Sequence, residues 1–142
     1  ARILFDIKDW LHEGLVLREK EFRTLIDAHD WSIYKNQYIA LHCTSNAIIS
    51  GWAYMLIRLQ LSGIAKQVVV GNLETLETTL YQKIIANLEL DYCANKPVII
   101  KGCSNKPVPQ NAYLFLIDKL YPIAKSILYG EACSSVPLYK KK

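Results

Sequence analysis

Short apolar runs alternate along the chain with longer stretches in which apolar residues recur at helical spacing. The runs are rich in Ile, Val and Leu, as is typical of parallel strands that are buried on both faces. The longer stretches place apolar residues three or four positions apart, as an amphipathic helix does. We predict strands at Arg2–Ile7, Tyr38–Leu41, Gln67–Val70, Pro97–Ile100 and Ser126–Tyr129, and helices at Glu19–His29, Ala47–Leu61, Leu73–Leu90 and Gln110–Tyr121.

This alternation of strands and helices predicts an α/β fold. Successive strand–helix–strand units imply a three-layer sandwich, in which a mostly parallel sheet of four or five strands carries helices on both faces. We expect residues 1–142 to form a single α/β domain that lacks a short N-terminal segment, because the chain begins without Met. Residues 136–142 are expected to be an irregular tail, since Pro137 argues against regular structure there.

Composition and charge exclude several classes of protein. Of the 142 residues, 51% are hydrophobic and 21% are charged, which excludes an intrinsically disordered chain. The longest apolar stretch, Ala47–Ile57, is too short to span a membrane. The formal net charge is +4, and Lys140–Lys142 supply three of these charges. We therefore expect neither nucleic acid nor membrane as a partner, and we interpret the lysines as a solvated end.

Polar residues follow each of the predicted core strands directly. In open parallel sheets, ligands bind beyond the carboxyl ends of the strands. Because parallel strands end at the same edge of a sheet, we expect these residues to gather at one site. They are His42, Cys43, Thr44, Ser45, Asn72, Glu74, Cys103, Ser104, Lys106, Glu131, Cys133 and Ser134.

Three of the four cysteines fall at this edge, and only Cys93 lies at the opposite one. Cys43 and Cys103 each precede a predicted helix, whose N-terminus favours a thiolate. Cys103 and Cys133 follow consecutive strands, so their Cα atoms should lie within about 10 Å of each other. We predict that Cys103 and Cys133, together with Cys43, form a thiol or metal site for zinc or iron. No CxxC pair occurs, and free thiols in a reducing cytoplasm are expected.

Two other interpretations of the same edge stay open. Free cysteines often fill apolar cores as small hydrophobic side chains, and the sheet would then be a scaffold for protein interactions. Alternatively, Ser104 and Lys106 precede a helix at a position that suits an anion, with Glu74 and Glu131 as further ligand-contacting residues. The chain has neither a Walker loop nor a dinucleotide fingerprint, so no nucleotide class is indicated.

Several segments resemble a known family. They are Phe5–Leu11, His29–Trp31, Gly71–Thr78, Lys101–Pro109 and Tyr129–Lys140. Over the whole chain, the sequence is similar to an uncharacterised bacterial family, domain of unknown function 2480. That family has no established activity to carry over. The resemblance implies a link to sulfur or metal handling, because genes of the family often lie near iron–sulfur cluster assembly genes.

Together, these observations favour a cytoplasmic accessory factor that handles thiols or metals in iron–sulfur or sulfur metabolism. Its expected partners are other proteins of that metabolism, or a second copy of the chain in a homodimer. One alternative is a non-catalytic protein-interaction module. The other is a small-molecule enzyme that binds an anionic ligand at the carboxyl edge of the strands. The residues identify no reaction, so the question of enzyme activity stays open.

Overall fold

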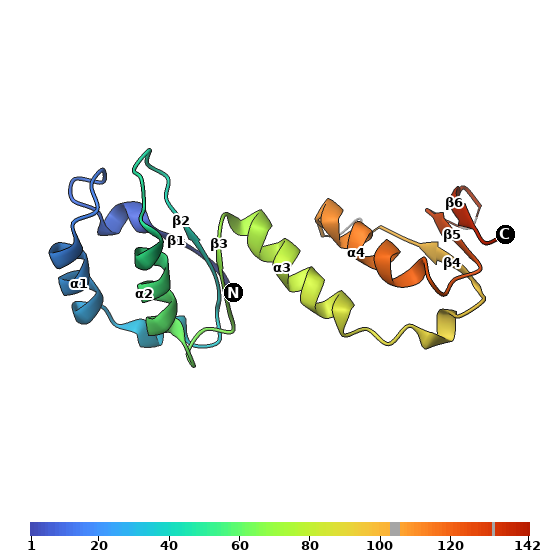
Figure 1. Ribbon diagram of the computed structural model, residues 1–142, viewed down its shortest axis with the longest axis horizontal. Helices are drawn as coiled ribbons and strands as arrows, with labels where there is room; N and C mark the ends of the chain where they lie inside the picture. Colours follow the sequence, from blue (N-terminus) through green and yellow to red (C-terminus); the bar gives the residue numbers. More distant parts are fainter. Residues whose placement is uncertain (103–105, 132) are drawn as a thin grey trace. The chain divides into compact units, whose positions relative to one another are not determined.

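The computed structural model describes residues 1–102, 106–131 and 133–142 (Figure 1). Contacts within the chain divide it into two compact units, Ala1–Thr79 and Leu80–Lys142. We call them the N-terminal unit and the C-terminal unit. Each unit is built around one three-stranded sheet.

The sheet of the N-terminal unit consists of three parallel strands. β2 (Tyr38–His42) is central, and β1 (Arg2–Asp6) and β3 (Gln67–Val70) flank it. Residues 39–41 of β2 are all buried. This explains why β2 has an uninterrupted apolar run, because both of its faces are covered.

Two helices pack on one face of this sheet and form the main core. α1 (Glu19–Ala28) contributes Phe22, and α2 (Gly51–Leu61) contributes Ile57. Both side chains are completely buried and belong to the same core as Phe5 of β1. The apolar residues of α1 recur on one side of the helix, which is why this helix buries only a stripe.

An aromatic cluster extends the core beside α1. It draws on two short 3-10 helices, η1 (Ile7–Trp10) and η2 (Trp31–Tyr34). The ring of Phe5 stacks against Trp10 and Trp31, with centroid distances of 5.3 and 6.0 Å. The indole N–H of Trp31 donates to a backbone carbonyl of α1 at 3.1 Å, so the buried donor is satisfied.

The first turns of α3 (Leu73–Ala86) contact the opposite face of the same sheet. Successive side chains of a strand point to opposite faces, so Arg2 points away from the face that bears Phe5. The Arg2 guanidinium pairs with the carboxylate of Glu77 on α3, and Leu76 is completely buried. Figure 1 shows α2 and the start of α3 on different sides of the strands.

The C-terminal unit has a mixed sheet and a smaller core. β4 (Pro97–Ile100) and β5 (Ser126–Tyr129) are parallel, whereas β6 (Val136–Lys140) runs antiparallel to β5. α4 (Gln110–Leu120) packs on one face of this sheet, and η3 (Asp91–Cys93) precedes β4. The buried residues of this core are Cys93, Ile100, Leu120, Ala124 and Ile127.

The predicted α/β class is confirmed, because α-helices alternate with strands along the described parts of the chain. The strands differ from the expectation of four or five in one sheet, because the described residues form six strands in two separate three-stranded sheets. An apolar run indicates that a strand is buried, but it carries no information about which strand lies beside it. The expected single domain over residues 1–142 and the three-layer sandwich stay predictions.

Three predictions about individual elements are wrong. α3 ends at Ala86 rather than at Leu90. Val136–Lys140 forms strand β6 instead of an irregular tail, because Pro137 sits on an edge strand at a register shift opposite Ile127 and Leu128. α2 begins at Gly51 rather than Ala47, and Ile48 in the preceding loop is 92% exposed. Among the helices of the described ranges, none has the length and apolar character needed to cross a membrane.

Candidate functional site

Asp6 joins the ends of β1 and β2 at the carboxyl edge of the first sheet. Its carboxylate accepts hydrogen bonds from the Lys8 N–H at 3.0 Å, the Thr44 N–H at 3.2 Å and the Thr44 hydroxyl at 2.7 Å. Desolvation raises the pKa of Asp6, but the bonds from Thr44 and Lys8 together outweigh it, so the pKa lies below its ordinary value. The charged carboxylate of Asp6 therefore connects, through hydrogen bonds, the segment that follows β1 with the loop that follows β2.

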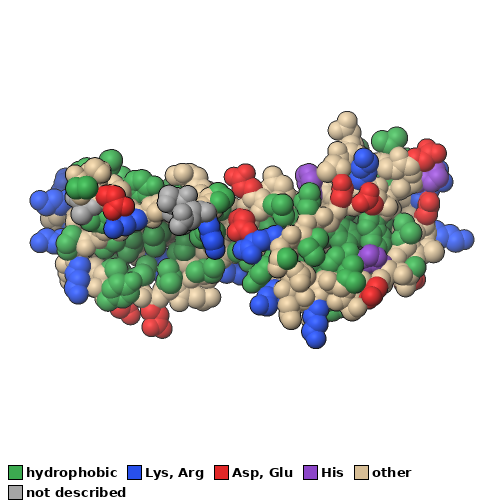
Figure 2. Space-filling model, turned by 180° about the vertical axis from the view of Figure 1, so that it is seen from behind, with side chains coloured by type: hydrophobic (Ala, Val, Ile, Leu, Met, Phe, Trp, Pro, Cys, Tyr) green, Lys and Arg blue, Asp and Glu red, His purple; other side chains and the backbone are tan. Residues whose placement is uncertain are grey.

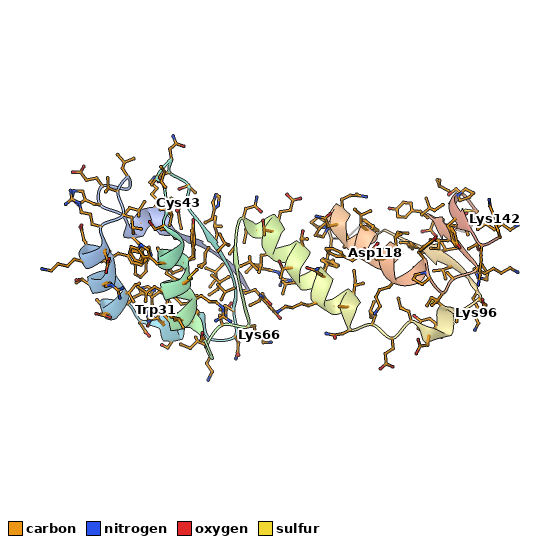
Figure 3. The ribbon with its side chains drawn as sticks, in the orientation of Figure 1. Trp31, Cys43, Lys66, Lys96, Asp118 and Lys142 are labelled. Atoms are coloured by element: carbon orange, nitrogen blue, oxygen red, sulfur yellow. The ribbon has the colours of Figure 1, made fainter. Side chains whose placement is uncertain are left out.

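Cys43 lies in the loop that follows β2 and is half-buried (Figure 3). It packs against the N-terminal core, and its Sγ lies 3.3 Å from the hydroxyl oxygen of Ser45. Burial raises the pKa of the nearby Tyr54 phenol, and the negative charge of an ionised Cys43 adds to this effect. These contacts are those of a cysteine that fills space at the border of a core.

Asn72 and Glu74 lie at the start of α3. The side-chain oxygen of Asn72 accepts hydrogen bonds from the N–H of Thr75 at 2.9 Å and from its hydroxyl at 3.0 Å, as an N-cap residue does. Gly71 precedes them with a φ of 145°, and a Cβ there would lie 2.6 Å from the Thr75 hydroxyl oxygen. Glu74 is exposed in the first turn, where a carboxylate stabilises the helix dipole. Both predicted residues thus support the start of the helix.

The carboxyl edge of the second sheet carries an ion pair and an exposed thiol. Lys101 follows β4, Glu131 follows β5, and their charged groups lie 3.3 Å apart. Cys133, two residues further on, is exposed and forms no disulfide with another described cysteine. Cys103 and Ser104 lie outside the described residues. The expected closeness of Cys103 and Cys133 therefore stays a prediction.

A groove in the C-terminal unit, of about 390 Å³, is lined mainly by aliphatic and tyrosine side chains. Three of them are aliphatic side chains more than half exposed to solvent, namely Leu114 at 54%, Val136 at 56% and Leu138 at 51%. We call it the α4–β6 groove, since these two elements form its rims. The described residues that line it are Ile100, Gln110, Tyr113, Leu114, Ile117, Tyr129, Val136 and Leu138.

Two tyrosine hydroxyls lie beside the groove, over Gly102. The rings of Tyr113 and Tyr129 meet edge to face, with centroids 5.7 Å apart. A Cβ at Gly102 would lie 2.8 Å from the hydroxyl of Tyr129 and 3.2 Å from that of Tyr113. A larger residue at position 102 would therefore force the Tyr129 hydroxyl to shift and would crowd the Tyr113 hydroxyl.

A comparison with known protein families gives a match over almost the entire chain. The match is to the family described as protein of unknown function, DUF2480, and it covers residues 1–141. The chain belongs to the DUF2480 family. No curated protein and no solved structure matches it. The family resemblance expected from the sequence is confirmed, and it assigns no activity to this DUF2480 protein.

The predicted site residues of the DUF2480 protein are divided between its two units. Cys43 and Glu74 belong to the N-terminal unit, whereas the exposed Lys106, Glu131 and Cys133 belong to the C-terminal unit. Within the ranges that the structure describes, no three His, Cys, Asp or Glu side chains lie close enough to hold a metal ion. A zinc or iron site that includes Cys103 therefore stays a prediction.

Two surfaces of the DUF2480 protein were not predicted from its sequence. One is the α4–β6 groove, and the other is a row of lysines at the amino edge of the second sheet. Both surfaces include residues of β6. They could not be predicted while residues 136–142 were expected to form an irregular tail. A usable signal was present, because Val136–Tyr139 is mostly apolar and follows a strand and a turn, as the second strand of a hairpin does.

Proposed function

We propose that this protein is a non-catalytic interaction module that binds an apolar segment of a partner protein in the α4–β6 groove. The observation that carries the proposal is the half-exposed apolar lining at Leu114, Val136 and Leu138. Apolar side chains that gather in an exposed patch mark interaction sites more often than scattered ones do. The lining also contains tyrosines, which are enriched where protein partners bind.

The chemistry of the groove supports binding rather than catalysis. The described residues that line it include no carboxylate, imidazole, thiol or ammonium group. The polar side chains among these described residues are the amide of Gln110 and the hydroxyls of Tyr113 and Tyr129. General acid–base catalysis needs a group that exchanges protons near neutral pH, and a tyrosine hydroxyl ordinarily titrates near pH 10.

The shape of the second sheet favours an amphipathic helix as the partner segment. A helix is about 10 Å wide and strands are about 4.8 Å apart, so one helix covers about two strands. α4 alone therefore leaves part of the three-stranded sheet uncovered, beside β6. Addition of a strand to β6 is disfavoured, because Pro137 and Lys140 lie on this edge and its register shifts. A second helix beside α4 would bury Leu114 and Leu138 together.

The groove is tested with the full chain and a display library of amphipathic helical peptides. A selected peptide should bind Leu114→Glu at least about tenfold more weakly, because a buried leucine contributes about 1.5–3 kcal/mol. Leu59→Glu is the matched control, since Leu59 is an exposed leucine of α2. A library without binders, or binders that are equally sensitive to both variants, would contradict the proposal.

Thiol or metal handling is the second candidate function, and the exposed thiol of Cys133 supports it. In this proposal Cys103 and Cys133 hold zinc or iron, and the partners are proteins of sulfur or iron–sulfur metabolism. Protein purified without oxygen should then contain zinc, iron or labile sulfide in a fixed ratio to the chain. The Cys103→Ser, Cys133→Ser double variant should lose it. Metal-free protein with inert thiols would leave only the interaction module.

The scaffold of the N-terminal unit is also part of the proposal. A three-layer arrangement around its sheet is supported by Ile57 of α2 in the core on one face and by the Arg2–Glu77 ion pair on the other. Such a covered sheet holds its loops in fixed positions, which suits an accessory protein.

A further inference from the structure

Lysines gather at the amino edge of the second sheet. β4 and β5 begin at this edge and the antiparallel β6 ends there, so lysines from three separate parts of the chain meet. The Lys125 N–H donates to the Lys96 carbonyl at 3.0 Å, and the Lys141 N–H donates to the Lys125 carbonyl at 2.8 Å. The set, which we call the lysine edge, is Lys96, Lys125, Lys140, Lys141 and Lys142.

The ammonium groups of the lysine edge are not paired with carboxylates from the described part of the chain. All of its residues are exposed, and none of them forms an ion pair with a described carboxylate. Figure 3 shows Lys96 and Lys142 at the end of the unit where β4 begins. Figure 2 shows blue side chains gathered over the same end of the C-terminal unit. Two strand spacings separate the outer lysines, so about 10 Å of sheet edge carries the whole set.

A hollow of about 380 Å³ lies directly beside the lysine edge, on the face opposite α4. Ile127 and Tyr129 pack toward α4, so by alternation Ser126 and Leu128 point to this other face. Lys140 pairs with Ser126 in the strand register and lies on the same face. The described lining is apolar apart from two hydroxyls and two ammonium groups: Pro97, Lys125, Ser126, Leu128, Pro137, Tyr139 and Lys140.

We propose that this hollow binds a short acidic segment of a partner protein that also carries an apolar side chain. The apolar side chain would lie on Leu128 and Pro137, and neighbouring carboxylates would pair with Lys125 and Lys140. Lysine ammonium groups are flexible point charges, which suit carboxylates of varied geometry. The site is independent of the α4–β6 groove, because the two lie on opposite faces of the sheet.

The observations favour an acidic peptide over nucleic acid. Proteins that hold single strands combine a basic track with aromatic rings on which the bases stack. Here the lysines occupy one edge rather than a track, and the hollow is lined by a single aromatic residue. That residue, Tyr139, already packs edge to face on Tyr121 with centroids 5.1 Å apart.

Titration calorimetry on the full chain tests the site with a short peptide that alternates Glu and Leu. The Lys125→Gln, Lys140→Gln double variant should bind this peptide at least about tenfold more weakly than the unchanged chain. Lys20→Gln, Lys35→Gln is the matched control, because it removes the same charge from exposed positions of the N-terminal unit and should bind normally. Affinity should also fall as salt rises from low to physiological concentration. Peptides with Gln in place of Glu, or Ser in place of Leu, should bind much more weakly.

Several results would overturn the proposal. One is equal binding by the double variant and the unchanged chain, with circular dichroism showing that both are folded. Another is lysine-dependent binding of phosphatidylserine vesicles or of a single-stranded oligonucleotide, without binding of the Glu–Leu peptide, which would reassign the edge to lipid or nucleic acid. Leu114→Glu separates this inference from the proposed function, because it should leave binding of the Glu–Leu peptide unchanged.

Discussion

In the N-terminal unit, individual carboxylates accept hydrogen bonds that hold loops against the neighbouring strands and 3-10 helices. Asp6 connects the end of β1 with Thr44 beyond β2. Asp30 caps η2 by accepting a hydrogen bond from the N–H of Ser32 at 3.1 Å, and the bonds from Ser32 lower the pKa of Asp30. Both residues are therefore negatively charged at neutral pH, and their contribution to stability depends on that charge.

Replacement of Asp6 by alanine should destabilise the N-terminal unit by about 1–2 kcal/mol at neutral pH, as loss of a capping carboxylate does. Asp6→Ala removes the acceptor for three hydrogen bonds at once. Urea denaturation followed across a range of pH measures the effect. Asp27→Ala is the control, because Asp27 is an exposed residue of α1, and it should change stability by less than about 0.5 kcal/mol.

The pH dependence of this effect has a definite sign. The pKa of Asp6 in the folded chain lies below its ordinary value. The Asp6 carboxylate therefore contributes fully to the free energy of unfolding at pH values above its unfolded pKa of about 3.9. The contribution is lost as the pH falls through the lower, folded pKa. The difference in the free energy of unfolding between the unchanged chain and Asp6→Ala should therefore become smaller at acidic pH. A difference that grows in acid would show that the carboxylate is not stabilised by these bonds.

At the scale of elements, β6 is the one that connects the two proposed binding surfaces. Val136 and Leu138 line the α4–β6 groove, while Pro137 and Lys140 line the hollow on the other face. The strand lies at the edge of its sheet, and three features protect that edge, namely a proline, a lysine and a register shift. This protection keeps both faces of β6 free for side-chain contacts.

Removal of this protection should make the protein associate through β6. We expect the Pro137→Val, Lys140→Val double variant to form dimers or larger species in a concentration-dependent way. An edge strand without proline or charged residues can pair with the edge strand of another molecule. Sedimentation velocity over a range of concentrations measures it. Lys141→Val alone should behave like the unchanged chain. If the double variant sediments like the unchanged chain, Pro137 and Lys140 have no protective role.

The elements themselves were largely predictable, and their partners were not. α4 was predicted within one residue, because Pro109 precedes it and Pro122 follows it closely. The start of α2 was misplaced because several residues before it, from Thr44 to Asn46, are good N-caps. Glu131 and Cys133 fall where expected after β5, but the pairing of Glu131 with Lys101 depends on strand register, which one sequence does not encode locally.

At the scale of the whole molecule, the two units have unequal cores. Among the residues that the structure describes, the N-terminal core contains twelve buried residues, including several aromatic rings, and the C-terminal core contains five. Buried apolar area is the main favourable contribution to folding, and small domains bury the least of it. We therefore expect the C-terminal unit to open more readily than the N-terminal unit.

Hydrogen exchange at increasing urea should show this difference. The amides of β2 should have opening free energies at least about 1 kcal/mol above those of β5. Ile127→Ala should lower the protection of β5 by about 2–5 kcal/mol and leave that of β2 unchanged. An equal loss of protection in β2 would mean that residues 1–142 unfold as one cooperative domain.

The aromatic cluster has a practical consequence for spectroscopy. All three tryptophans, Trp10, Trp31 and Trp52, lie in the N-terminal unit, and the C-terminal unit contains six of the nine tyrosines. Tryptophan emission therefore reports on the N-terminal unit alone. A melting curve recorded by this emission would give no signal from the part of the chain that carries the groove and the lysine edge. Tyrosine emission, or a tryptophan introduced at Tyr121, would be needed to follow that part.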